Sequence, residues 1–194
     1  MQRTDLGRIM GFTDGVMAVA ITLLVLNIEV PQVSENDLED ALVDLLPSLY
    51  AYVLSFALIG RFWVLHHNRF ETFVGFDASL MALNLLFLAL IGLIPFSTDL
   101  LDEYTDSALA TATFSVSIAL ASLCHSAMAA YAVRKGFVHE DRLADYAWPR
   151  TVSGLALAVI FLAAAPLAFV TVELSHILWI ATFFVRYPLR RLGT

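Results

Sequence analysis

Long apolar runs, separated by short polar segments, fill this chain of 194 residues. A membrane-spanning helix needs roughly 20 consecutive, mostly apolar residues. Six segments meet that requirement, and a short turn marked by Pro166, Thr171 and Glu173 separates the last two. The pattern predicts an all-α integral membrane protein, one six-helix domain over residues 1–194, with helices at about 8–30, 46–66, 78–98, 107–133, 148–168 and 170–187.

The first loop between these segments has a pattern of its own. In the stretch SENDLEDALVDLLP, the apolar residues Leu38, Ala41, Leu42 and Leu45 recur at helical intervals. Ser34 precedes them in the position of a helix cap, with an acid three residues on, as in a capping box. A short amphipathic helix outside the membrane is therefore expected here.

Composition supports the membrane assignment. Hydrophobic residues make up 59% of the chain and charged residues 15%, with a mean hydropathy of +0.77. Soluble domains have about 45–50% apolar and about 25% charged residues. The single cysteine, Cys124, excludes a disulfide framework and a four-cysteine zinc site.

The charged residues are distributed unequally between the two sides. All 11 Lys and Arg residues fall at or near the side that holds both termini and the second and fourth loops. By the positive-inside rule this side is cytoplasmic, in a multi-pass protein of the plasma membrane. Of the 18 acids, 11 fall on the opposite side or at its edge: Glu29, Glu35, Asp37, Glu39, Asp40, Asp44, Asp99, Asp102, Glu103, Asp106 and Glu173. Such a surface concentrates cations, although outer loops that simply avoid Lys and Arg would give the same pattern.

Several polar side chains lie within the predicted spans, where they are costly unless paired or functional. Those of the first three helices fall at one depth near the cytoplasmic side: Arg8, Asp14, Trp63, His66, His67 and Asn84. Buried polar groups need hydrogen-bond partners. We expect a structural network in which Asp14 accepts from a His, Trp or Asn side chain and Arg8 donates to carbonyls or a carboxylate. Which of His66 and His67 takes part is open at this point.

An enzyme is disfavoured. Asp14 is the only aspartate well inside a predicted span, and the GxGD pattern of membrane aspartyl proteases is absent. His66 and His67 are adjacent, so on a helix they point about 100° apart and make a poor metal pair. No metal site, no cofactor and no nucleic-acid partner is expected, and His125 and His176 are interpreted as packing residues.

The first predicted helix carries a second pattern. Val19, Thr22, Leu23 and Leu26 follow the spacing i, i+3, i+4, i+7 and therefore share one face, whereas Asp14 lies on another. This uncharged stripe is able to line a pore. It is equally able to meet lipid or another helix.

The stretch RIMGFTD, Arg8 to Asp14, resembles the R-x-x-x-F-S-D signature of the transmembrane protein 175 family of potassium channels. The similarity continues through DGVMAVAITLLVLNIEVP, and through SFALIGRFWVLHHNRF and NLLFLALIGLIPFSTDLL in the next two helices. Two positions depart from the family pattern: Thr13 replaces the usual Ser, and Val19 is smaller than the more typical Ile or Leu.

This resemblance implies a homotetramer in the membrane lipid with the first helix of each copy lining a central pore for potassium ions. It places a hydrophobic constriction at Val19, Leu23 and Leu26, with a hydroxyl ring at Thr22. The signature residues Arg8, Phe12, Thr13 and Asp14 are expected to face away from the pore and lock the first helix against the next two.

A potassium leak channel is thus the predicted function, since apolar rings gate by dewetting and favour ions that shed water readily. Selectivity by this route is expected to be modest. Two alternatives remain at this point: a proton- or cation-coupled transporter, and a non-conducting membrane scaffold.

Overall fold

The computed structural model describes the backbone of residues 3–143 and 151–184. All longer elements in these ranges are helical, and the strand pairing found there is one isolated bridge between Phe73 and Val138. The α-helices are α1 (Arg3–Leu23), α2 (Leu38–Asp44), α3 (Leu46–Phe70), α4 (Ala78–Gly92), α5 (Ile94–Glu103), α6 (Ala108–Arg134), α8 (Thr151–Leu167) and α9 (Val172–Phe184). Short 3-10 turns add η1 (Leu24–Asn27), η2 (Glu35–Asp37) and η3 (Glu140–Arg142).

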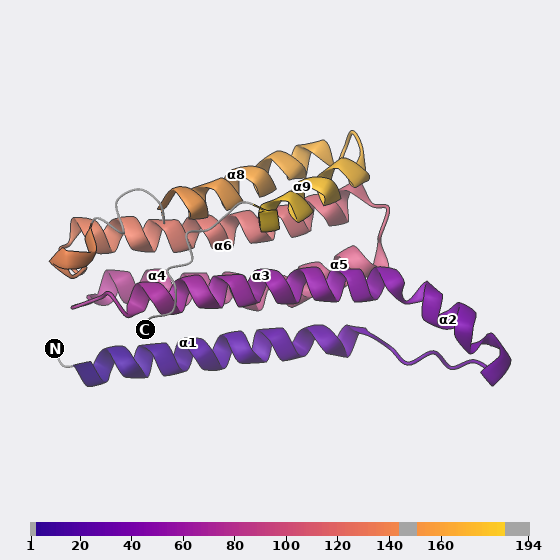
Figure 1. The fold of residues 1–194 in the computed structure, drawn as a ribbon, viewed down its shortest axis with the longest axis horizontal. Coiled ribbons are helices and arrows are strands. Elements are labelled where there is room, and N and C mark those ends of the chain that lie inside the picture. The colour runs from indigo at the N-terminus through magenta and orange to yellow at the C-terminus, as the bar shows by residue number, and fades with distance from the viewer. Residues whose placement is uncertain (1–2, 144–150, 185–194) are drawn as a thin grey trace.

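The long helices lie roughly along one common axis, and those that follow one another in the chain alternate in direction (Figure 1). The α1 helix forms one edge of the bundle and packs against α3, α4 and α5. At the other edge, α8 packs on α6 and α9 on α8, while α4 and α5 connect α6 to the rest of the bundle. Among the residues that the structure describes, no helix packs on the other side of α1.

Four helical segments are long and apolar enough to cross a membrane: Leu6–Leu26, Leu46–Phe70, Ala78–Glu103 and Ala108–Arg134. The helices of the predicted fifth and sixth spans are shorter, with apolar parts at Gly154–Leu167 and Val172–Phe183. Residues 148–150 and 185–187 of those two predictions lie outside the described residues. The chain is accordingly a membrane protein with several apolar helices.

The predicted span at residues 78–98 lies within the apolar segment Ala78–Glu103, but its helix is interrupted by one residue. It breaks at Leu93, between α4 and α5. Pro95 stands in the first turn of α5; it has no backbone N–H to donate, and its ring clashes with the carbonyl group four residues earlier. Gly92, a weak helix former, immediately precedes the break.

The short helix predicted in the first loop is present as α2, preceded by η2, and none of its residues is buried. The Ser34 side chain does not cap it as expected, because its hydroxyl donates to the Asp37 carboxylate at 2.7 Å instead. The helix therefore begins one 3-10 turn later than a capping box would place it.

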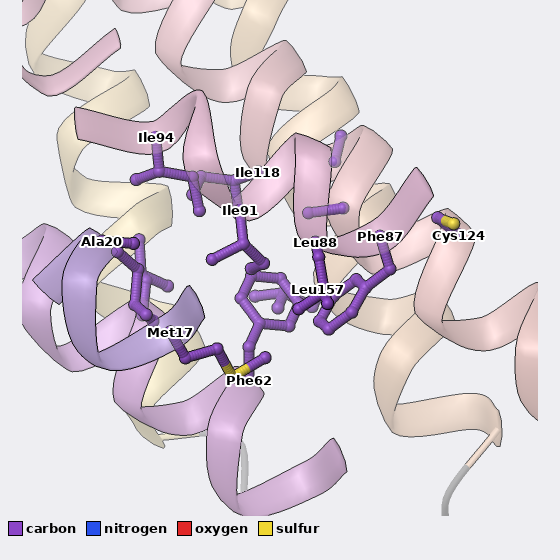
Figure 2. Packing of buried hydrophobic residues seen from close by; sticks show 14 of the residues in the cluster. Met17, Ala20, Phe62, Phe87, Leu88, Ile91, Ile94, Ile118, Cys124 and Leu157 are labelled. Carbon is purple, nitrogen blue, oxygen red and sulfur yellow. The ribbon is translucent and has the colours of Figure 1, made fainter. Parts of the chain in front are cut away.

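The core consists of large apolar side chains contributed by helices from both edges of the bundle. Figure 2 shows Met17 and Ala20 of α1, Phe62 of α3 and Phe87 of α4 within this cluster. The carboxylate of Asp77 accepts hydrogen bonds from the backbone N–H of Leu80 and the hydroxyl of Tyr131, and so joins the start of α4 to α6. These two donors lower the pKa of Asp77 below its usual value.

Candidate functional site

The α1 helix has two contrasting faces. Ile9, Thr13, Met17, Ala20 and Leu24 are buried, and their spacing of three or four residues places them on one side of the helix. That side packs on α3, α4 and α5. Helix packing within the subunit therefore accounts for one face of α1 only.

The opposite side of α1 is exposed and mostly apolar. The exposed fractions are 57% for Val19, 41% for Leu23 and 70% for Leu26, the last lying in η1. The exposed Thr22 donates its hydroxyl hydrogen to the carbonyl of Val19 at 2.9 Å. Because that hydrogen points back to the helix, the lone pairs of the Thr22 oxygen are available to a group outside it.

A shallow apolar hollow of about 490 Å³ lies beside this exposed face. Gly11 and Gly15 line it from α1 and Gly92 from the end of α4, together with Val19 and Leu23. A Cβ atom added at any of the three glycines would meet nothing within 4 Å. The absence of side chains at these positions therefore opens the surface next to Val19 and Leu23.

A chain of buried polar groups fastens α1 to α3 and α4. The side-chain amide of Asn84 donates to the Thr13 hydroxyl at 3.2 Å, and its carbonyl oxygen lies 2.8 Å from Nε2 of His66. Because an amide oxygen only accepts, Nε2 of His66 is the donor and carries the proton. Rings of Phe70 and Phe87 stack on this imidazole, at centroid distances of 4.2 Å and 5.4 Å.

A second connection lies beside the first. The indole N–H of Trp63 donates to the Asp14 carboxylate at 2.8 Å. His67 stacks on the Trp63 ring at 5.5 Å, and its Nε2 lies 3.3 Å from the carboxylate of Glu71. Asp14 itself remains exposed within the subunit. The connection therefore uses one oxygen of Asp14 and leaves the carboxylate accessible to a further donor.

The structure places Arg8 and Phe12 apart from these connections. Both are exposed and line a second hollow, of about 350 Å³, together with Ile9, Phe76 and Met81. Within the described part of the chain Arg8 makes no hydrogen bond or ion pair, so the donor role expected for it is not found there. Neither His66 nor His67 bonds directly to Asp14.

Sequence reasoning missed a buried cation. Arg69 is 2% exposed, and its Nη1 donates to Nδ1 of His125 at 2.9 Å and to the backbone carbonyl of the same residue. His125, interpreted from the sequence as a packing residue, is thus a hydrogen-bonded link between α3 and α6. The spacing offered a signal, because Arg69 follows the buried Phe62 and His66 by seven and three residues and so shares their face.

Over residues 3–143 and 151–184, no group of three or more His, Cys, Asp or Glu side chains is arranged to hold a metal ion. The polar groups described above bond mainly to one another across helices. Two of these contacts, Asn84 with Thr13 and Trp63 with Asp14, hold α1 against the neighbouring helices.

These features define an all-helical membrane protein whose first helix is held by polar contacts on one face and left bare on the other. Residues 8–95 match the family described as the endosomal/lysosomal potassium channel TMEM175. A potassium channel of Streptomyces collinus is 39% identical over 142 residues, which are 71% of this chain and 69% of that protein. The chain belongs to the TMEM175 family, a family of ion channels and not of enzymes.

Two further comparisons agree with this assignment. A potassium channel of Chamaesiphon minutus is 44% identical over 106 residues, covering 53% of this chain and 52% of that protein. The crystal structure of a lysosomal potassium-selective channel TMEM175 homolog from Chamaesiphon minutus matches with a TM-score of 0.77 at 30% identity. That match covers 94% of this chain and 96% of the other, so the similarity extends to the helices beyond residue 95.

Proposed function

We propose that this protein is a potassium-selective leak channel of the plasma membrane, in which four copies surround a pore lined by α1. The observation that carries the proposal is the bare apolar face of α1, in a chain similar to proteins named potassium channels. A face that only contacts lipid would be apolar too. The exposed face of α1 lies beside small residues that allow another helix to approach, and this favours contact with a second copy over contact with lipid.

The constriction consists of rings of Val19, Leu23 and Leu26 around the pore axis. Apolar rings of small radius lose their water and block ions until the pore widens. The exposed fractions of these side chains support this role, since none is used fully in packing within the subunit. The oxygen of Thr22 adds one polar ring, and its free lone pairs favour a partly dehydrated cation over an anion.

Contact between copies uses the glycines of α1. Gly11 and Gly15 are four residues apart, and small residues at this spacing let membrane helices approach closely. The hollow that they line is open on the subunit surface. A neighbouring helix seated there covers α1 at Gly11 and Gly15, one turn or more before Val19, and leaves Thr22 and Leu26 with access to the axis.

The signature residues serve this pore indirectly. Thr13 and Asp14 bond to Asn84 and Trp63, from α4 and α3, and so fix the rotation of α1 about its own axis. That rotation decides which side chains reach the pore. Six spans with both termini in the cytoplasm complete the proposal, with α8 and α9 as the two shorter spans.

Replacement of Leu26 by Ala tests the constriction. The narrower side chain widens the ring, and we expect potassium flux into liposomes to rise by about tenfold, which corresponds to a barrier lower by about 1.4 kcal/mol. Leu162→Ala on α8, another exposed leucine outside the proposed pore, is the matched control and is expected to keep the original flux. Unchanged flux and ion preference in Leu26→Ala would remove Leu26 from the constriction.

A further inference from the structure

The hollow that contains Arg8 lies at one end of the bundle. Arg8 stands two residues inside the apolar segment Leu6–Leu26, and Met81 stands three residues inside the segment Ala78–Glu103. Both segments begin at the same end of the molecule, where α1 and α4 start (Figure 1). In the proposed orientation this end meets the cytoplasmic leaflet, so the hollow lies near the depth of its lipid headgroups.

The lining combines one cation with apolar walls. The Arg8 guanidinium is the charged group of the lining, and Phe12, Phe76 and Met81 supply apolar surface next to it. Asp77, which follows the lining residue Phe76, is not part of the lining; its carboxylate accepts from Leu80 and from Tyr131 of α6. A ligand that fits must therefore carry an anionic head and an apolar tail.

We propose that this hollow binds one anionic phospholipid of the cytoplasmic leaflet per subunit. The phosphate accepts two hydrogen bonds from the planar guanidinium of Arg8, a geometry that suits phosphate oxygens. The first part of one acyl chain lies against Phe12, Phe76 and Met81. Arg8 is the one charged side chain among the residues that line the hollow, so it alone sets the preference for an anionic headgroup.

A second copy of the chain is the competing occupant. The proposed contact between copies uses the other hollow, which Gly11, Gly15 and Gly92 line farther along α1 and which meets this one at Phe12. At the Arg8 end, copies arranged around one axis would bring their Arg8 side chains toward one another. Like charges repel, whereas a lipid phosphate neutralises the guanidinium.

The inference rests on the proposed orientation in the membrane and not on the conduction pathway. Its test therefore measures lipid binding by native mass spectrometry of the full chain in detergent, during titration with phosphatidylglycerol or phosphatidylcholine. We expect the wild-type protein to retain one phosphatidylglycerol per subunit in preference to phosphatidylcholine. Arg8→Gln is expected to lower phosphatidylglycerol retention by about fivefold, the effect of losing one cation at an anionic headgroup.

Two further variants make the result specific. Met81→Trp fills the hollow while keeping Arg8, and is expected to lower retention as well. Arg134→Gln removes an exposed cation at the end of α6 and is expected to leave retention unchanged. If Arg8→Gln does not fold, the comparison of Met81→Trp with Arg134→Gln still decides the proposal.

Three results would overturn it. Retention that is equal in wild type, Arg8→Gln and Met81→Trp would show that the lipid binds elsewhere. Displacement of phosphatidylglycerol by inorganic phosphate at equal concentration would show a phosphate site without a lipid chain. Loss of the oligomer in Arg8→Gln, with phosphatidylglycerol still bound to the monomer, would identify a second copy as the occupant. Potassium flux is measured separately, so a failure of lipid binding is distinguishable from a failure of conduction.

Discussion

At the scale of single residues, the polar groups of the first three long helices divide by role. Thr13, His66 and Asn84 are buried. The side-chain amide of Asn84 donates a hydrogen bond to Thr13 and accepts one from His66. An unsatisfied polar group in a buried site costs the full desolvation of that group. The network therefore specifies how α1 sits on α3 and α4.

Replacement of Asn84 by Leu, a side chain of similar size, tests this role. It leaves the Thr13 hydroxyl and Nε2 of His66 without their partner. We expect a loss of about 1–3 kcal/mol in the free energy of unfolding, measured as a lower thermal unfolding midpoint in detergent. Ser117→Ala is the control, since that hydroxyl bonds only to the Thr113 carbonyl of its own helix. Equal midpoints for the wild type and Asn84→Leu would contradict a structural role for the network.

At the scale of elements, the sequence predicts the helices better than their ends and contacts. Apolar length alone locates the helices around residues 8–30, 46–66, 78–98 and 107–133, because every helix in lipid must satisfy its own backbone. It does not reveal the break at Leu93, where the effect of Pro95 competes with a strongly apolar run. Nor does it reveal that Arg69 turns inward to His125, because charge alone suggests a solvated side chain.

The candidate site, too, is predicted from the sequence only in part. Helical periodicity predicts that Val19, Thr22, Leu23 and Leu26 share a face, and these side chains are exposed together on α1. Periodicity cannot say what covers that face, since lipid and a second helix are both apolar. The assignment of a pore comes from the family and from the space beside Gly11 and Gly15.

The contact between copies is testable at this scale through Gly15→Leu. Within the subunit a side chain at Gly15 meets nothing within 4 Å, and leucine favours the helix over glycine by about 0.8 kcal/mol. The subunit is therefore expected to fold, while the tetramer dissociates because a neighbour can no longer approach α1. Light scattering on the purified protein measures the mass of the particle. A small exposed residue of α8, Ala163, replaced by Leu is the control, and an intact tetramer in Gly15→Leu would place the contact elsewhere.

At the scale of the whole molecule, the subunit is asymmetric about α1. A packed support lies on one side of α1 and consists of α3, α4, α5 and α6, with α8 and α9 beyond them. In the described part of the chain no helix covers the other side of α1. Over the described residues, one subunit thus presents an exposed apolar surface on α1 and no enclosed path. Four copies that meet at α1 would close the path around rings of Val19, Leu23 and Leu26, and each copy would keep its packed support toward the lipid.

If α1 lines the path of the potassium ions, a thiol introduced by Thr22→Cys lies in that path. Cys124, buried in α6, is first replaced by Ser so that the new thiol is the only one. Potassium flux through reconstituted Thr22→Cys channels is measured before and after a small water-soluble cationic thiol reagent, with Leu162→Cys in the same background as the control. We expect the reagent to abolish most of the flux in Thr22→Cys and none in Leu162→Cys. Flux that is present and insensitive to modification at Thr22 would contradict it.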